Sequence, residues 1–271
     1  VSAEAAAKQA FAGLKGTADD AAVFISPFLT LEEMWVAAQF AEKVMGVKSN
    51  AIAVALKKRE LTPVEAILVS PDIAPNGRGA ELLNICSGGD GWREELQSNY
   101  EALLRRIESG GVKRALFVGD RSVVDSDVNS ALLGKILSID CAVSIGCDAV
   151  SSGGNVSAAN GCKIILPGRT VNEKGGVMVN RTFIQQRIKP LLTAPFGTFA
   201  EWMWLSRIAK SGGVELVPAT VGDERSLSRH LAKSIAPFSS GPFAGSGADK
   251  NSDAGTGKLG TGSSVAATIT A

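Results

Sequence analysis

Short apolar runs alternate with amphipathic segments through the first two thirds of the chain. Strands are predicted over residues 21–26, 66–69, 113–120, 141–145 and 163–166. A strand that is apolar on both faces has to be covered on both faces, and helices that connect parallel strands provide that cover. The pattern therefore predicts a doubly wound α/β fold, with a mostly parallel sheet and helices on both faces.

Helical patterns lie between these runs, at residues 3–15, 30–45, 94–109 and 126–137. Thr30 and Glu33 have the spacing of a capping box, in which each side chain bonds a backbone amide of the first helical turn. Glu32 and Glu33 are therefore interpreted as a helix start before they are interpreted as a carboxylate pair. Gly46 follows the last apolar position of this pattern and predicts its end.

Composition divides the chain into four parts. Residues 1–108 and 109–213 are predicted to form two α/β sub-domains, and residues 214–236 a short closing segment. Residues 237–271 are rich in Gly, Ser, Ala and Thr and poor in large apolar side chains, so this tail is predicted to be disordered. The sequence opens on Val1 inside a helical pattern and lacks a signal-peptide pattern, which we interpret as the start of a fragment or of a processed chain.

Charge and cysteine usage exclude several classes of function. The formal net charge of +1 gives no strong field for nucleic acid or for an anionic membrane, and no apolar run is long enough to span a bilayer. Zinc and iron–sulfur sites use closely spaced Cys or His ligands, whereas the cysteines here are scattered and His230 is the single histidine. We therefore predict no metal site in this chain. The cysteines, interpreted as buried apolar residues in a reducing compartment, are Cys86, Cys141, Cys147 and Cys162.

The candidate binding edge follows from the predicted fold. Ligands of doubly wound sheets bind at the carboxyl ends of the strands, where glycines let the backbone approach and helix N-termini attract phosphates. The loops predicted there span residues 26–30, 70–79, 119–125 and 147–161, and their candidate cofactor-binding residues are Asn76, Gly119, Asp120, Gly153 and Asn155. The alternative is that protein side chains fill this edge. No catalytic residues are predicted, because no nucleophile, base and oxyanion hole come together.

Three stretches occur in an order and spacing that resemble the molybdopterin oxidoreductase superfamily. The first is Pro75-Asn76-Gly77-Arg78-Gly79-Ala80-Glu81, and the second is the predicted strand that ends in Gly119-Asp120. In the third, Leu166-Pro167 is followed by Glu173, Gly176 and Asn180. Within the superfamily the chain is most similar to the carboxyl-terminal portion of the large iron–sulfur subunit of NADH:quinone oxidoreductase (respiratory complex I).

The resemblance implies a structural part of a redox subunit. Iron–sulfur clusters are expected upstream in the full-length chain, with other redox subunits of a membrane-associated complex as partners, at the cytoplasmic face of the membrane. Cys162-Lys163 stands where cofactor-binding members have Ala-Asp, and residues 155–158 replace their Thr-rich loop, which fits the complex I relatives that lack the molybdenum cofactor. The enzyme alternative is a molybdopterin-dependent oxidoreductase that contributes part of a pocket for molybdopterin guanine dinucleotide. A further alternative is a free-standing nucleotide-binding module.

Overall fold

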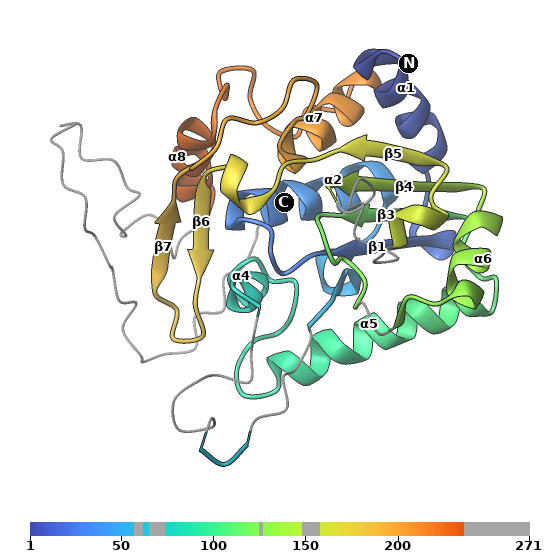
Figure 1. Ribbon diagram of the computed structural model, residues 1–271, viewed down its shortest axis with the longest axis horizontal. Helices are drawn as coiled ribbons and strands as arrows, with labels where there is room; N and C mark the ends of the chain where they lie inside the picture. The colour runs from blue at the N-terminus through green and yellow to red at the C-terminus, as the bar shows by residue number, and fades with distance from the viewer. Residues whose placement is uncertain (57–61, 65–73, 125–126, 148–157, 236–271) are drawn as a thin grey trace, which may run out of the picture.

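A five-stranded parallel sheet forms the centre of the computed structural model, which describes residues 1–56, 62–64, 74–124, 127–147 and 158–235. The strand order is β2-β1-β3-β4-β5, a common order of doubly wound sheets. The strands are β1 (Ala21–Ile25), β2 (Ala53–Val54), β3 (Arg114–Val118), β4 (Cys141–Gly146) and β5 (Ile164–Pro167), shown in Figure 1. The predicted α/β class is therefore confirmed.

Successive residues of the central strands contribute to two separate cores. In β1, Val23 and Ile25 belong to the larger core, whereas Ala22 and Phe24 belong to the smaller one. All five residues of β1 are buried, as are all five of β3, because side chains of a strand alternate between the two faces and both faces are covered. This double burial is the physical origin of the continuous apolar runs in the sequence.

Helices cover both faces of the sheet. The larger core is formed with α1 (Ala3–Leu14), α2 (Leu31–Met45) and α7 (Glu201–Ser211). The smaller core is formed with α5 (Trp92–Glu108) and α6 (Ser130–Ser138). In Figure 1, α1 and α7 lie above the sheet, whereas α5 lies below it.

An antiparallel hairpin stands beside the carboxyl ends of the strands. Its strands are β6 (Gly176–Val179) and β7 (Gln185–Ile188), and it is flanked by α4 (Gly77–Leu82) and α8 (Glu224–Ser234) (Figure 1). Short 3-10 turns complete the described elements, and they are Ala18–Asp20, Ser49–Ala51, Ala158–Gly161 and Val171–Glu173.

Several predicted elements differ from those observed. Helix α6 begins at Ser130 and not near residue 126, because the Asn129 side chain accepts a hydrogen bond from the Leu132 amide and caps the helix there. Strand β2 was not predicted, since two paired residues give too short a pattern. The hairpin strand β7 is polar and was also missed, and β6 pairs with it outside the main sheet. The predicted strand at 66–69 lies outside the described residues.

Pairing within the sheet crosses the predicted boundary between the first two sub-domains. Residue Ala22 of β1 pairs with Ala115 of β3, so one sheet joins residues on both sides of position 108. The division into sub-domains stays a prediction. The predicted tail at 237–271 lies outside the described residues. None of the helices among the described residues combines the length and the apolar character needed to cross a membrane.

Candidate functional site

The strands β1 and β3 are neighbours in the sheet, and from this pair the chain continues to β2 on one side and to β4 and β5 on the other. Ligands of such sheets bind at the carboxyl ends of the two strands where the direction of the connections changes. Gly119 follows β3 with φ of 79°, a left-handed conformation that favours glycine. A Cβ at Gly119 would lie 2.7 Å from Leu29 Cδ2 and 2.9 Å from Ser26 Cβ. Gly119 is therefore needed for close packing of the two loops, and protein atoms occupy the space beside it.

Asp120 links the loops after β3 and β4. Its Oδ1 accepts a hydrogen bond from the Cys147 amide, and its Oδ2 accepts one from the Cys147 thiol, both at 2.6 Å. Cys147 is half-buried and makes a polar contact, so its interpretation as a buried apolar residue was wrong. The other three cysteines are buried, as predicted. Burial raises the pKa of Cys86 to about 11 and that of Cys162 to about 12, which keeps these thiols protonated.

Asn76 is fully buried and joins three segments of the chain. Its Nδ2 donates to the Leu29 carbonyl and its Oδ1 accepts from the Val179 amide, both at 2.9 Å. Its own amide donates to the Pro27 carbonyl at 3.2 Å. The side-chain amide thus holds the loop after β1 against the hairpin, which is a structural role. Contact between Asn76 and a cofactor stays a prediction.

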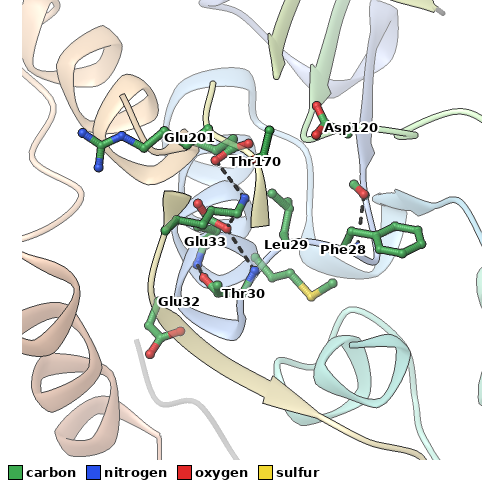
Figure 2. A network of polar contacts seen from close by, with 12 residues as sticks. Phe28, Leu29, Thr30, Glu32, Glu33, Asp120, Thr170 and Glu201 are labelled. Atoms are coloured by element: carbon green, nitrogen blue, oxygen red, sulfur yellow. Dashed lines mark hydrogen bonds and ion pairs between the residues drawn. The ribbon is translucent and has the colours of Figure 1, made fainter. Parts of the chain in front are cut away.

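A buried ionic cluster occupies the start of α2, and Figure 2 shows it from close by. The Nζ of Lys174 lies 2.9 Å from Glu33 Oε2 and 3.0 Å from Glu201 Oε2. The Lys174 side chain is 4% exposed and each glutamate side chain 1%. Glu33 lies in the first turn of α2, Lys174 precedes β6 and Glu201 is the first residue of α7. The glutamate–lysine cluster (Glu33, Lys174 and Glu201) therefore connects three elements that are distant in sequence.

The net charge of this cluster is zero when one of its two glutamates is protonated. Burial raises the pKa of Glu33, but Lys174, Glu201 and the Thr30 amide outweigh that effect, so its pKa lies below the usual value. Burial and the neighbouring Glu33 raise the pKa of Glu201 well above the usual value. Burial lowers the pKa of Lys174, yet the two glutamates reverse that effect and raise it. These directions favour an arrangement in which Lys174 is a cation, Glu33 is ionised and Glu201 keeps its proton.

Glu32 has a separate function beside this cluster. Its Oε2 accepts a hydrogen bond from the Val177 amide at 2.9 Å, and its Oε1 accepts one from the Ser228 hydroxyl. Burial raises the pKa of Glu32. Together with Asn76, Glu32 therefore satisfies the β6 amides that point away from β7, which fastens the hairpin to α2 and α8.

The sequence predicted one part of this arrangement and missed another. The capping box of Thr30 and Glu33 is present, so the interpretation as a helix start is confirmed. Neither Lys174 nor Glu201 was given a role from the sequence. Lys174 is 27 residues from Glu201, a separation at which no local pattern signals the contact. The candidate residues Gly153 and Asn155 lie outside the described residues.

Among the described residues, no group of three or more His, Cys, Asp or Glu side chains is arranged to hold a metal ion. His230, on α8, packs edge-on against the Trp35 ring at 5.5 Å between centroids, and burial lowers its pKa.

Comparison with known proteins gives no family: no protein-family model matches the chain, and no curated protein matches it. The interpretation of the site therefore rests on its own contacts.

Proposed function

We propose that this chain is the carboxyl-terminal α/β part of a large subunit of NADH:quinone oxidoreductase type. In this proposal it scaffolds electron transfer that iron–sulfur clusters carry out elsewhere, and it contains no catalytic residue of its own. Its partners are other redox subunits of a membrane-associated complex, on the cytoplasmic side. The three stretches that resemble this family support the proposal.

One observation supports the scaffold role: at the edge where a ligand of this fold would bind, the polar side chains of Asn76 and Asp120, both among the described residues, already bond to the chain itself. Both polar ends of the Asn76 side chain are bonded to backbone groups. Both Asp120 oxygens accept from Cys147, and Gly119 packs against Leu29. A pterin dinucleotide would need polar groups of this kind for its own hydrogen bonds, because buried polar atoms without partners are costly.

Motif residues of the family resemblance also have structural contacts here. Glu173 closes a capping box with Thr170. Asn180 accepts hydrogen bonds from the amides of Thr182 and Ile184 in the hairpin turn, both at 2.9 Å. These contacts support a role in maintaining the shape of the domain.

The enzyme alternative is a pocket for molybdopterin guanine dinucleotide, and ligand-induced stabilisation separates it from the scaffold role. We expect thermal unfolding of the chain to be unchanged by this dinucleotide or by GDP. A ligand at a hundredfold excess over its dissociation constant would stabilise the fold by about 2.7 kcal/mol. A shift of that size in the wild type that disappears in Asp120→Ala would overturn the scaffold role in favour of the pocket.

The scaffold role itself is tested in the full-length subunit within its complex. Lys174→Met is expected to lower the amount of assembled complex, because it disrupts the buried glutamate–lysine cluster. Electron transfer per assembled complex, normalised to iron content, should stay at the wild-type rate. Lys8→Ala is the control, since Lys8 lies exposed on α1 in an ion pair with Glu4. A normal yield of complex with a reduced rate per complex would contradict the proposal.

A further inference from the structure

The glutamate–lysine cluster holds an amine and two carboxyl groups in contact, shielded from bulk water. The Lys174 Nζ lies 2.9 Å from Glu33 Oε2 and 3.0 Å from Glu201 Oε2, and the three side chains are 1% to 4% exposed. The Lys8–Glu4 pair on α1 has a similar separation of 3.2 Å, but its side chains are 63% and 78% exposed. The buried groups are therefore protected from the water that opposes formation of an amide.

The surrounding structure fixes both carboxyl groups. Glu33 Oε2 also accepts a hydrogen bond from the Thr30 amide at 2.9 Å, which holds this group at the start of α2. A Cβ at Gly168 would lie 3.0 Å from Glu201 Oε1, so the Glu201 carboxyl group packs into the space that this glycine leaves. Reacting groups held in contact can reach effective concentrations of about 10⁵–10⁸ M, which favours a bond that free molecules in water would not form.

One oxygen of each carboxyl group is poorly satisfied. Among the described residues, Glu33 Oε1 and Glu201 Oε1 are buried without a hydrogen-bond partner. Buried polar atoms without partners are costly, and so are buried charges. Condensation of the amine with one carboxyl group releases one oxygen as water and replaces a buried ionic contact with a neutral amide.

We propose that Lys174 and Glu201 condense in the folded chain to an isopeptide bond, with Glu33 as the group that accepts a proton from the amine. The bond joins the residue just after the turn of residues 171–173 to the first residue of α7. The inference concerns a covalent modification of the chain itself, so it does not depend on the redox role proposed above.

The three side chains supply every atom of the reaction. Glu201, which keeps its proton, is the electrophile, and ionised Glu33 is the base. A proton passes from Nζ to Glu33, the neutral amine attacks Cδ of Glu201, and the bond from Cδ to the hydroxyl oxygen breaks. Nζ loses two protons in all: one stays on Glu33, and the other leaves with the hydroxyl group as water. The products are an amide, a neutral Glu33 and one water molecule, so the net charge does not change.

The ionic cluster is the reactant of this condensation and the state of the newly folded chain. The amine begins as an ammonium ion, which is not nucleophilic, so the reaction is slow. In the condensed chain, a covalent bond closes the segment from Lys174 to Glu201. Such a bond restricts the unfolded state as a disulfide does, and it should raise the midpoint of thermal unfolding.

The test is mass spectrometry of the full chain, held folded at neutral pH and then denatured. We expect a mass that is lower than the mass of the sequence by one water molecule. Trypsin should release residues 170–181, uncleaved after Lys174, joined to residues 188–207, which contain Glu201. Without the bond, trypsin cleaves after Lys174 and the two segments separate.

Two variants and one internal pair serve as controls. Lys174→Arg keeps the cation but has no amine to condense, so it should keep the mass of its sequence while its circular dichroism stays that of the wild type. Glu33→Gln should slow formation of the joined product about a hundredfold, because glutamine cannot take up the proton. The exposed Lys8–Glu4 pair should remain unjoined in the wild type.

Several results would overturn the proposal. They are an unchanged mass of the folded wild type, a joined product through Glu33, and equal condensation in a chain kept unfolded in urea. A loss of one water molecule with normal cleavage after Lys174 would overturn it as well, because an aspartyl succinimide at Asp90-Gly91 has the same change in mass.

Discussion

Two ionic clusters, one at each end of the sheet, each surround a cation with hydrogen-bond acceptors, but the acceptors differ in their exposure to water. At the carboxyl ends, Lys174 is enclosed between Glu33 and Glu201. At the amino ends, the first residue of β3, Arg114, donates from Nε to Asp20 Oδ1 at 3.0 Å and from Nη1 to the Leu14 carbonyl at 2.7 Å. The Asp20 side chain is 35% exposed, so water reaches this second cluster.

The comparison indicates that the exposure of the anions to water determines how much stability is lost when their cation is replaced. Arg114 bonds the Leu14 and Thr17 carbonyls as well as Asp20. The carbonyls remain neutral when the cation is removed, and Asp20 can hydrate. Glu33 and Glu201 have no access to water. Whether each carboxyl group is ionised therefore depends on the nearby Lys174 cation and on protonation. The carboxyl-end cluster should therefore be far more sensitive to substitution.

The largest effect is expected for Lys174→Met. This change leaves two buried carboxyl groups without a cation, and breaking a buried ion pair in this way costs about 3–5 kcal/mol. Urea unfolding at neutral pH measures the loss of free energy, with Lys8→Met as the exposed control. A loss below about 1 kcal/mol would mean that the cluster is not buried as described.

Glu201→Gln is expected to be much milder near neutral pH and to change the pH dependence of stability. Folded Glu201 keeps its proton where the unfolded carboxyl, with a pKa of 4.5, has lost it. The unfolded state then binds fewer protons, so this group lowers stability by about 1.4 kcal/mol per pH unit as the pH rises from 4.5 towards the folded pKa.

Glutamine cannot ionise, so the variant should show a shallower decline of stability in this range. Glu32, whose pKa is also raised, contributes a decline that remains in the variant. The measurement is the free energy of unfolding at a series of pH values from 5 to 8, as a difference between the two proteins. Parallel curves would show that Glu201 is ionised throughout.

Asp20→Asn should cost about 1 kcal/mol, the upper range of exposed ion pairs. The Arg114 guanidinium holds the pKa of Asp20 below its usual value, so the stabilisation is present above the unfolded pKa of 3.8 and is lost as the pH falls below it. Added salt should separate the two variants. In 1 M NaCl the stability difference between wild type and Asp20→Asn should become smaller, whereas the difference between wild type and Lys174→Met should stay the same. Equal salt sensitivity of the two variants would contradict the assigned difference in exposure.

Cys147→Ala should have the smallest effect, about 0.5 kcal/mol, because the backbone amide at position 147 still donates to Asp120. Cys147→Ser keeps a donor and serves as the matched control. Thermal unfolding measures both variants. A loss above about 2 kcal/mol for alanine alone would show that the thiol contributes more than one half-buried hydrogen bond.

Features within one element could be predicted from its own residues. The apolar run at β3, the capping box of Thr30 and Glu33 and the end of α2 at Gly46 agree with the structure, because each depends on neighbours a few residues away. The strand β2 could not be predicted, since its two residues form a strand only by pairing with Phe24 and Ile25 of β1.

The local pattern of residues thus sufficed for the α/β class, because burial on both faces of a strand leaves a continuous apolar run in the chain. Only tertiary packing brings Lys174, Glu201 and Asn76 into contact with the residues that they bond. The Asn76 side chain meets the Val179 amide across 103 residues, and Glu32 meets Val177 across 145. A polar residue in a turn has the same local pattern whether water or a distant carboxylate surrounds it, so only the folded chain distinguishes an exposed turn lysine from the buried Lys174.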